Sequence, residues 1–160
     1  MKKIFFIVAL LATVFAQNTF AQSTETQAPS SQILSLYYNI KDALIAGNAI
    51  AAASGAEVFL KSANEAGSKS ISESTINALI KDATAISKTK DLKEQRVRFA
   101  DLSTNMFAAV KATKLTDQPV YQAYCPMKKA LWLSNSTAIK NPYYGSAMLT
   151  CGKVVETINQ

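Results

Sequence analysis

The sequence predicts an all-α fold: an antiparallel four-helix bundle over residues 32–114, followed by an irregular, cysteine-containing tail over residues 115–160. Three observations support this fold class. Apolar residues recur at helical spacing in four consecutive segments. The connections between these segments are short, which favours antiparallel neighbours. After Lys114 the helical period stops, and prolines limit any further helix to a short piece.

The first two predicted helices are marked by residues at their ends. Apolar residues at alternating steps of four and three begin after Gln32, and Gly47 stands where a helix commonly ends. Asn48 is suited to cap a second helix, which runs to about Glu65 and is followed by Gly67. This second segment is rich in alanine, serine and glycine, so we expect a neighbouring backbone to approach it closely.

The third and fourth predicted helices have polar caps. Ser70 or Ser72 is suited to cap a helix whose apolar stripe ends near Lys88. Asp91 followed by Glu94 makes a start that resembles a capping box, with Asp in place of Ser or Thr. In the tail, residues 120–124 are expected to be extended, and a short helix or strand is expected over residues 153–158.

The N-terminus has the pattern of an export signal. Lys2 and Lys3 precede an uncharged apolar run from Ile4 to Phe15, and Thr19-Phe20-Ala21 offers small residues for cleavage. The run is shorter than the ~20 residues that span a bilayer as a helix. We therefore predict a signal peptide over residues 1–21, no membrane span in the mature protein, and a periplasmic or secreted location.

The mature chain is expected to form a single domain. Residues 22–31 are rich in Ser, Thr, Gln and Pro without an apolar period, so they are predicted to be a flexible leader. Residues 32–160 then form one helical domain, because about 140 residues suit one core.

Composition excludes several function classes. The chain has no histidine, which removes Ser-His-Asp and Cys-His catalysis and histidine-based zinc sites. Losing Lys2 and Lys3 lowers the formal net charge from +6 by two, to +4, and the charges lie in mixed pairs such as Lys41-Asp42. This pattern argues against nucleic-acid binding. The carboxylates fall on predicted helix surfaces without converging, so we expect no enzyme activity.

The tail pairs each of its two cysteines with a methionine, Cys125 with Met127 and Cys151 with Met148. Thiolates and thioethers are soft donors that prefer Cu(I) or Ag(I), so these four residues are candidate ligands for a monovalent metal. Alternatively, Cys125 and Cys151 form a disulfide and the two methionines are core, or both cysteines stay free thiols. Such a bond is worth about 3–4 kcal/mol by loop entropy, and an oxidising compartment favours it.

The aromatic residues of the tail allow two interpretations. Trp132, Tyr143 and Tyr144 lie in turn-rich segments, with Pro142 and Gly145 on either side of the tyrosine pair. A rigid turn that presses these rings onto the bundle is the simpler interpretation. The other is an exposed contact surface made of the three rings.

Several motifs in order carry a family resemblance, which extends from about Ile33 to Ile158. The motifs are Tyr38-x-Ile40-Lys41-Asp42-Ala43-Leu44, Gln95-Arg96-x-x-Phe99-x-x-Leu102-Ser103, Cys125-Pro126-Met127, Trp132-Leu133-Ser134, Asn141-Pro142-Tyr143-Tyr144-Gly145 and Met148-Leu149-x-Cys151-Gly152. Through them the chain resembles an uncharacterised bacterial domain of unknown function, found alone in exported proteins and fused to periplasmic adaptor subunits of copper and silver efflux systems.

The resemblance implies an extracytoplasmic helical domain associated with copper or silver handling. We therefore expect a non-enzymatic periplasmic binding or accessory protein that holds Cu(I) or Ag(I) for heavy-metal efflux or resistance, with a periplasmic efflux component as its partner. The alternative is a disulfide-stapled helical module for protein interaction that binds no metal.

Overall fold

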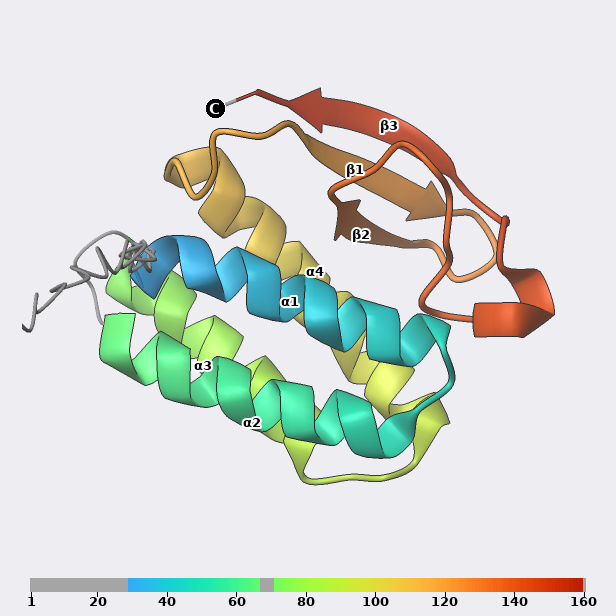
Figure 1. The fold of residues 1–160 in the computed structure, drawn as a ribbon, viewed down its shortest axis with the longest axis horizontal. Helices are drawn as coiled ribbons and strands as arrows, with labels where there is room; N and C mark the ends of the chain where they lie inside the picture. Colours follow the sequence, from blue (N-terminus) through green and yellow to red (C-terminus); the bar gives the residue numbers. More distant parts are fainter. Residues whose placement is uncertain (1–28, 67–70, 160) are drawn as a thin grey trace, which may run out of the picture.

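The computed structural model describes residues 29–66 and 71–159, and these residues form four helices followed by a small sheet (Figure 1). The predicted signal peptide, and residues 22–28 of the predicted leader, lie outside the described residues. The elements in chain order are α1 (Pro29–Ile45), α2 (Ala49–Ala66), α3 (Glu73–Ser87), α4 (Leu92–Ala112), β1 (Val120–Cys125), β2 (Ala130–Ser134), the 3₁₀ helix η2 (Gly145–Met148) and β3 (Lys153–Ile158).

The four predicted helices are confirmed, and three of their caps act as expected. Asn48 accepts a hydrogen bond from the backbone N–H of Ala51 at 2.9 Å. Ser72 accepts one from Thr75 at 3.3 Å, and Asp91 accepts one from Lys93 at 2.8 Å. These bonds satisfy N–H groups that have no partner inside a helix.

The first helix differs from its prediction at its N-terminal end. It begins at Pro29, so residues 29–31 are helical and do not belong to a flexible leader. It ends at Ile45, and Gly47, with a φ of 71°, has the left-handed conformation that commonly follows a helix, as predicted. Gly55 of α2 faces Ile40 of α1, and a Cβ added there would lie 3.4 Å from the Ile40 side chain, which confirms the close approach of these two helices.

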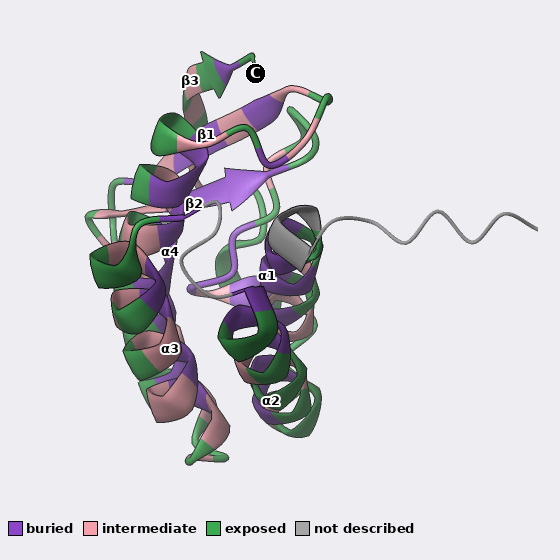
Figure 2. Ribbon diagram, turned by 90° about the vertical axis from the view of Figure 1, so that its left-hand side faces the viewer, coloured by how far each residue is buried: buried purple, intermediate pink, exposed green. Residues whose placement is uncertain are grey.

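The helices pack in sequence order, α1 on α2, α2 on α3 and α3 on α4. Their apolar faces form one continuous core in which Tyr37, Phe59, Phe99 and Met106 are fully buried. Figure 2 shows the buried residues along the facing sides of the helices and along β2. No helix in the described ranges is long and apolar enough to cross a membrane.

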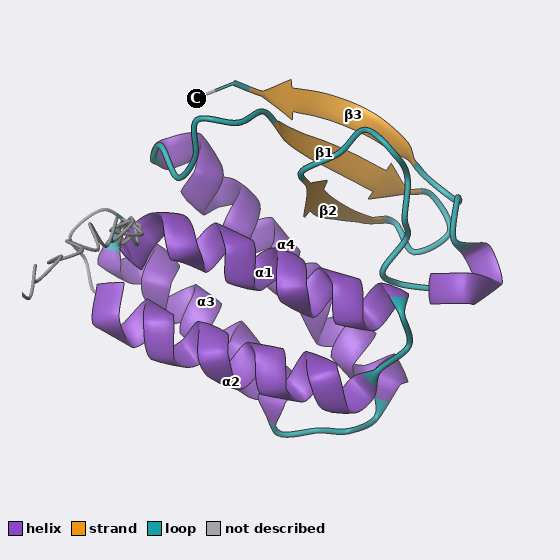
Figure 3. Ribbon diagram, viewed as in Figure 1, coloured by secondary structure: helices purple, strands orange, loops and turns teal. Residues whose placement is uncertain are grey.

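The prediction of an all-α fold with an irregular tail was wrong. The tail contains a three-stranded antiparallel sheet in the order β2-β1-β3, so the fold is mainly α with a small sheet (Figure 3). The extended run at residues 120–124 lies in β1, and residues 153–158 form β3. The strand β2 was missed. Its five residues are too few for a distinct period, and its pairing with β1 depends on a register that local sequence does not specify.

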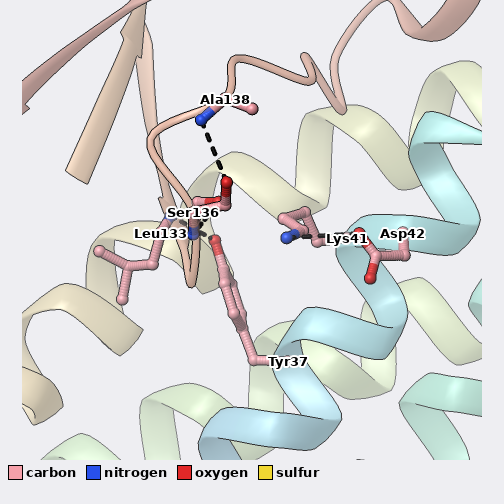
Figure 4. Close-up of polar contacts among 7 residues, drawn as sticks. Tyr37, Lys41, Asp42, Leu133, Ser136 and Ala138 are labelled. Atoms are coloured by element: carbon pink, nitrogen blue, oxygen red, sulfur yellow. Dashed lines mark hydrogen bonds and ion pairs between the residues drawn. The ribbon is translucent and has the colours of Figure 1, made fainter. Parts of the chain in front are cut away.

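The sheet lies over one face of the bundle, with β2 packed against α4. A buried polar junction joins the two parts. The hydroxyl of Tyr37, on α1, accepts a hydrogen bond from the backbone N–H of Leu133 at 3.0 Å (Figure 4). The same hydroxyl lies 2.8 Å from the hydroxyl of Ser103, on α4. Burial raises the pKa of Tyr37 well above its usual value, so the hydroxyl stays neutral.

We expect Tyr37→Phe to lower the free energy of unfolding by about 1–3 kcal/mol, because it leaves the buried N–H of Leu133 without a partner. Urea denaturation of the reduced protein would measure this change. Tyr121→Phe is the matched control, since Tyr121 is only partly buried and should change stability by less than about 0.5 kcal/mol. An equal effect of the two variants would contradict the structural role of the junction.

Candidate functional site

The two cysteines lie side by side at one end of the sheet. Cys125 is the last residue of β1 and is fully buried, while Cys151 precedes β3 and is partly buried. The pairing of Tyr124 with Lys153 between β1 and β3 brings the two positions together. Both cysteines are free thiols, and Cys125 lies close enough to Cys151 to raise the pKa of the Cys151 thiol. The structure thus places close together the two cysteines on which both the metal and the disulfide hypotheses depend.

The sulfur of Cys125 accepts two N–H donors. The side-chain amide nitrogen of Asn141 lies 3.1 Å from it, and the backbone nitrogen of Lys128 lies 3.4 Å from it. Lys128 is in the turn that follows β1, so the chain folds back over its own cysteine. These two hydrogen bonds hold the Cys125 sulfur in one orientation.

Asn141 holds the two cysteine segments together, and sequence reasoning missed this role. Its side chain is fully buried. In addition to Cys125, its amide donates to the backbone carbonyl of Cys151 at 2.7 Å, and its carbonyl oxygen accepts from the backbone N–H of Tyr143 at 2.8 Å. The sequence analysis named Asn141 only as the first residue of the motif Asn141-Pro142-Tyr143-Tyr144-Gly145 and gave it no role of its own.

The thiol of Cys151 is protonated at neutral pH. Burial and the neighbouring Cys125 raise the pKa of Cys151 above its ordinary value. A soft metal bound here would therefore displace a proton, because the thiolate and not the thiol is the metal ligand.

The two methionines of the predicted metal set are at the surface. Met127 lies in the turn after β1 and is 61% exposed, and Met148 ends η2 and is 40% exposed. The backbone N–H of Cys151 donates to the carbonyl of Met148 at 3.1 Å, so this methionine is one turn from the cysteine. The expectation that both methionines are core was wrong. Both thioethers are exposed to solvent, and each methionine is close in sequence to one of the two cysteines.

Of the three aromatic residues offered as a contact surface, two are buried. Trp132 is 1% exposed and Tyr143 is 4% exposed, whereas Tyr144 is partly buried. The rings of Trp132 and Tyr143 meet edge to face at 6.1 Å, and the Tyr143 hydroxyl donates to the carbonyl of Leu131. Trp132 and Tyr143 therefore pack in the core, as the simpler interpretation expects, and the three rings do not form one exposed surface.

Gly152, next to Cys151, lets the Trp132 ring lie against the backbone. Its φ is +146°, and an added Cβ would lie 2.7 Å from the ring and 2.9 Å from the carbonyl oxygen of Tyr124. Only glycine fits this position, because the backbone oxygen cannot move aside cheaply. Gly152 therefore allows the start of β3 to lie close to the end of β1.

In residues 29–66 and 71–159, no three or more His, Cys, Asp or Glu side chains lie close enough to hold a metal ion together. A metal at the cysteine pair would therefore have two thiolates, with thioethers as the remaining protein donors. This donor set fits Cu(I) or Ag(I), which accept low coordination numbers and soft ligands, and does not fit zinc.

The comparison with protein families gives one match. The family described as "Protein of unknown function (DUF3347)" matches residues 33–118. The matched segment includes nearly all of the four helices and ends just before β1, so both cysteines lie outside it. No curated protein and no solved structure matches the chain. With more than half of its length matched, the chain belongs to the DUF3347 family of proteins of unknown function.

Proposed function

We propose that this protein is a non-enzymatic periplasmic accessory protein that binds Cu(I) or Ag(I) through Cys125 and Cys151 and serves heavy-metal efflux or resistance. The observation that carries the proposal is the adjacent pair of free thiols, with one sulfur oriented by two N–H donors. Two thiolates at one point satisfy the preference of a monovalent soft metal.

The surface methionines support the proposal. A thioether exposed to water next to a thiol is available as a third donor, whereas a thioether in the core is not. Met127 and Met148 each lie within a few residues of a cysteine and are exposed. An efflux component as partner is suggested by the family resemblance that the ordered motifs carry, and a periplasmic location by the export pattern of residues 1–21.

Competition with a Cu(I) chelator tests the proposal. The reduced mature protein is titrated against bicinchoninate, and Met127→Leu and Met148→Leu should each weaken Cu(I) binding on the order of tenfold. Met106→Leu is the matched control, because Met106 is fully buried in the bundle core. If the surface variants bind as tightly as the control, the methionines are not ligands.

The pH dependence of binding gives a further prediction. Because the pKa of Cys151 is raised, this thiol is protonated between pH 6 and pH 8 and must lose its proton when the metal binds. The apparent Cu(I) affinity should therefore rise about tenfold per pH unit for this one proton. Titrations at several pH values with a chelator of known proton affinity would measure the slope. A slope of zero would exclude Cys151 as a ligand.

A second candidate function is a disulfide-stapled interaction module that binds no metal. The same adjacency of Cys125 and Cys151 favours it, because two neighbouring thiols can be oxidised to a disulfide by a periplasmic oxidant. Intact mass of protein isolated from the periplasm, after alkylation with and without reductant, distinguishes the two candidates. Quantitative protection from alkylation, together with no Cu(I) binding after reduction, would favour this module.

A further inference from the structure

A cavity of about 290 Å³ lies beside the cysteine pair, on the outside of the junction between α4 and the tail. Helix α4 contributes three of its residues, and the turn after β1 and the segment before η2 contribute the others. The lining residues are Lys93, Arg96, Val97, Lys128, Tyr143 and Tyr144.

The charges at this cavity are all of one sign. Lys93, Arg96 and Lys128 are cations, and none of the lining residues is a carboxylate. Within residues 29–66 and 71–159, none of the three forms an ion pair. The cavity therefore presents uncompensated positive charge, and an anionic group would be attracted to it.

Arg96 is the most constrained of the three cations. Its Nη2 donates to the backbone carbonyl of Leu44 at 2.9 Å, and its Nε is buried without a partner in the described part of the chain. A Cβ added at Gly145 would lie 2.5 Å from the Nη2, so this glycine leaves room for the guanidinium. The Arg96 guanidinium is thus held at the wall of the cavity by a neutral backbone carbonyl, and it has no carboxylate partner among the described residues.

The remaining walls are apolar or aromatic. Val97 is 43% exposed, and the rings of Tyr143 and Tyr144 complete the lining. An inorganic anion alone would leave this apolar surface uncovered. A ligand that combines a carboxylate with an apolar side chain would contact both kinds of wall. Pockets for drug-sized ligands start at ~300 Å³. The cavity of about 290 Å³ is at this lower limit, so it suits about two side chains.

We propose that this cavity binds an acidic segment of a partner protein, with a carboxylate among Lys93, Arg96 and Lys128 and an apolar neighbour over Val97 and the tyrosine rings. The backbone N–H of Lys128 donates to the sulfur of Cys125, so the bound segment lies beside the thiol pair. The inference rests on charge and shape and does not require metal binding, so the metal-free protein tests it.

Two-dimensional ¹⁵N NMR of the reduced, metal-free protein tests the proposal. The probes are short peptides that alternate glutamate with leucine, phenylalanine or tryptophan, and the same peptides with glutamine in place of glutamate. We expect the acidic peptides to shift the resonances of the lining residues, more weakly as salt is added, and the glutamine peptides to bind at least about fivefold more weakly. Inorganic phosphate and acetate should not displace the peptides at equal concentration.

Charge variants locate the site. Lys93→Gln and Lys128→Gln should each weaken peptide binding about two- to fivefold, as expected for partly exposed ion pairs. Lys129→Gln is the matched control, because Lys129 is adjacent in the chain but lines a different cavity. The proposal is overturned if no acidic peptide shifts these resonances, if Lys129→Gln weakens binding equally, or if phosphate alone displaces the peptides.

Discussion

Gly152→Ala is expected to lower the free energy of unfolding by about 4 kcal/mol. The backbone conformation at φ +146° is strained for any residue with a side chain, which costs about 1–3 kcal/mol. The added Cβ also overlaps the Trp132 ring and the carbonyl oxygen of Tyr124, and such overpacking costs about 1–3 kcal/mol more. Urea denaturation of the reduced protein would measure the sum.

Gly55→Ala is the control for this prediction. Gly55 lies inside α2 with a helical backbone, and the new Cβ would lie 3.4 Å from the side chain of Ile40, which can adjust. The gain in helix propensity, about 1 kcal/mol, offsets the tighter contact. If Gly152→Ala is as stable as Gly55→Ala, the backbone just before β3 does not lie against Trp132 as described.

Asn141→Ala is the second prediction with a large effect, a loss of about 3 kcal/mol. The truncation leaves the N–H of Tyr143 and the carbonyl of Cys151 without their side-chain partner, and each unsatisfied buried group costs about 1–3 kcal/mol. It also opens a cavity at a site that is fully buried. The same variant should weaken Cu(I) binding, because the Asn141 amide bridges the sulfur of Cys125 and the backbone carbonyl of Cys151.

Asn135→Ala serves as the control for this residue, since Asn135 is exposed in the loop after β2 and should change stability by less than about 0.5 kcal/mol. Thermal or urea unfolding would compare the two variants, and the chelator competition would compare their Cu(I) affinities. A stability loss below about 1 kcal/mol for Asn141→Ala would show that its hydrogen bonds are replaced by water.

The four helices could be predicted because their signals are local. Apolar spacing, the caps at Asn48, Ser72 and Asp91, and the glycine at position 47 each act within a few residues. The sheet depends on pairings between distant segments. Strand β1 lies between β2 and β3, and β3 returns only after a loop and a short 3₁₀ helix, so no local pattern specified the arrangement.

Only part of the candidate site could be predicted, because some of its contacts join segments that are distant in the sequence. Cysteines are recognisable by type, and their adjacency was expected under either hypothesis. The role of Asn141 was not, because it arises from bonds to Cys125 and Cys151, whose segments meet it only in the folded chain. The exposure of Met127 and Met148 was also missed, since an apolar residue in a turn has no local signal that separates core from surface.

The central claim, that the sulfurs of Cys125 and Cys151 hold a monovalent metal, is tested most directly by copper K-edge X-ray absorption. The reduced mature protein is loaded with one equivalent of Cu(I) and desalted, in parallel with a variant carrying Cys125→Ser and Cys151→Ser. We predict a nearest shell made only of sulfur in the native protein and no retained copper in the variant. A nearest shell of nitrogen or oxygen, or loss of copper from the native protein on desalting, would contradict the claim.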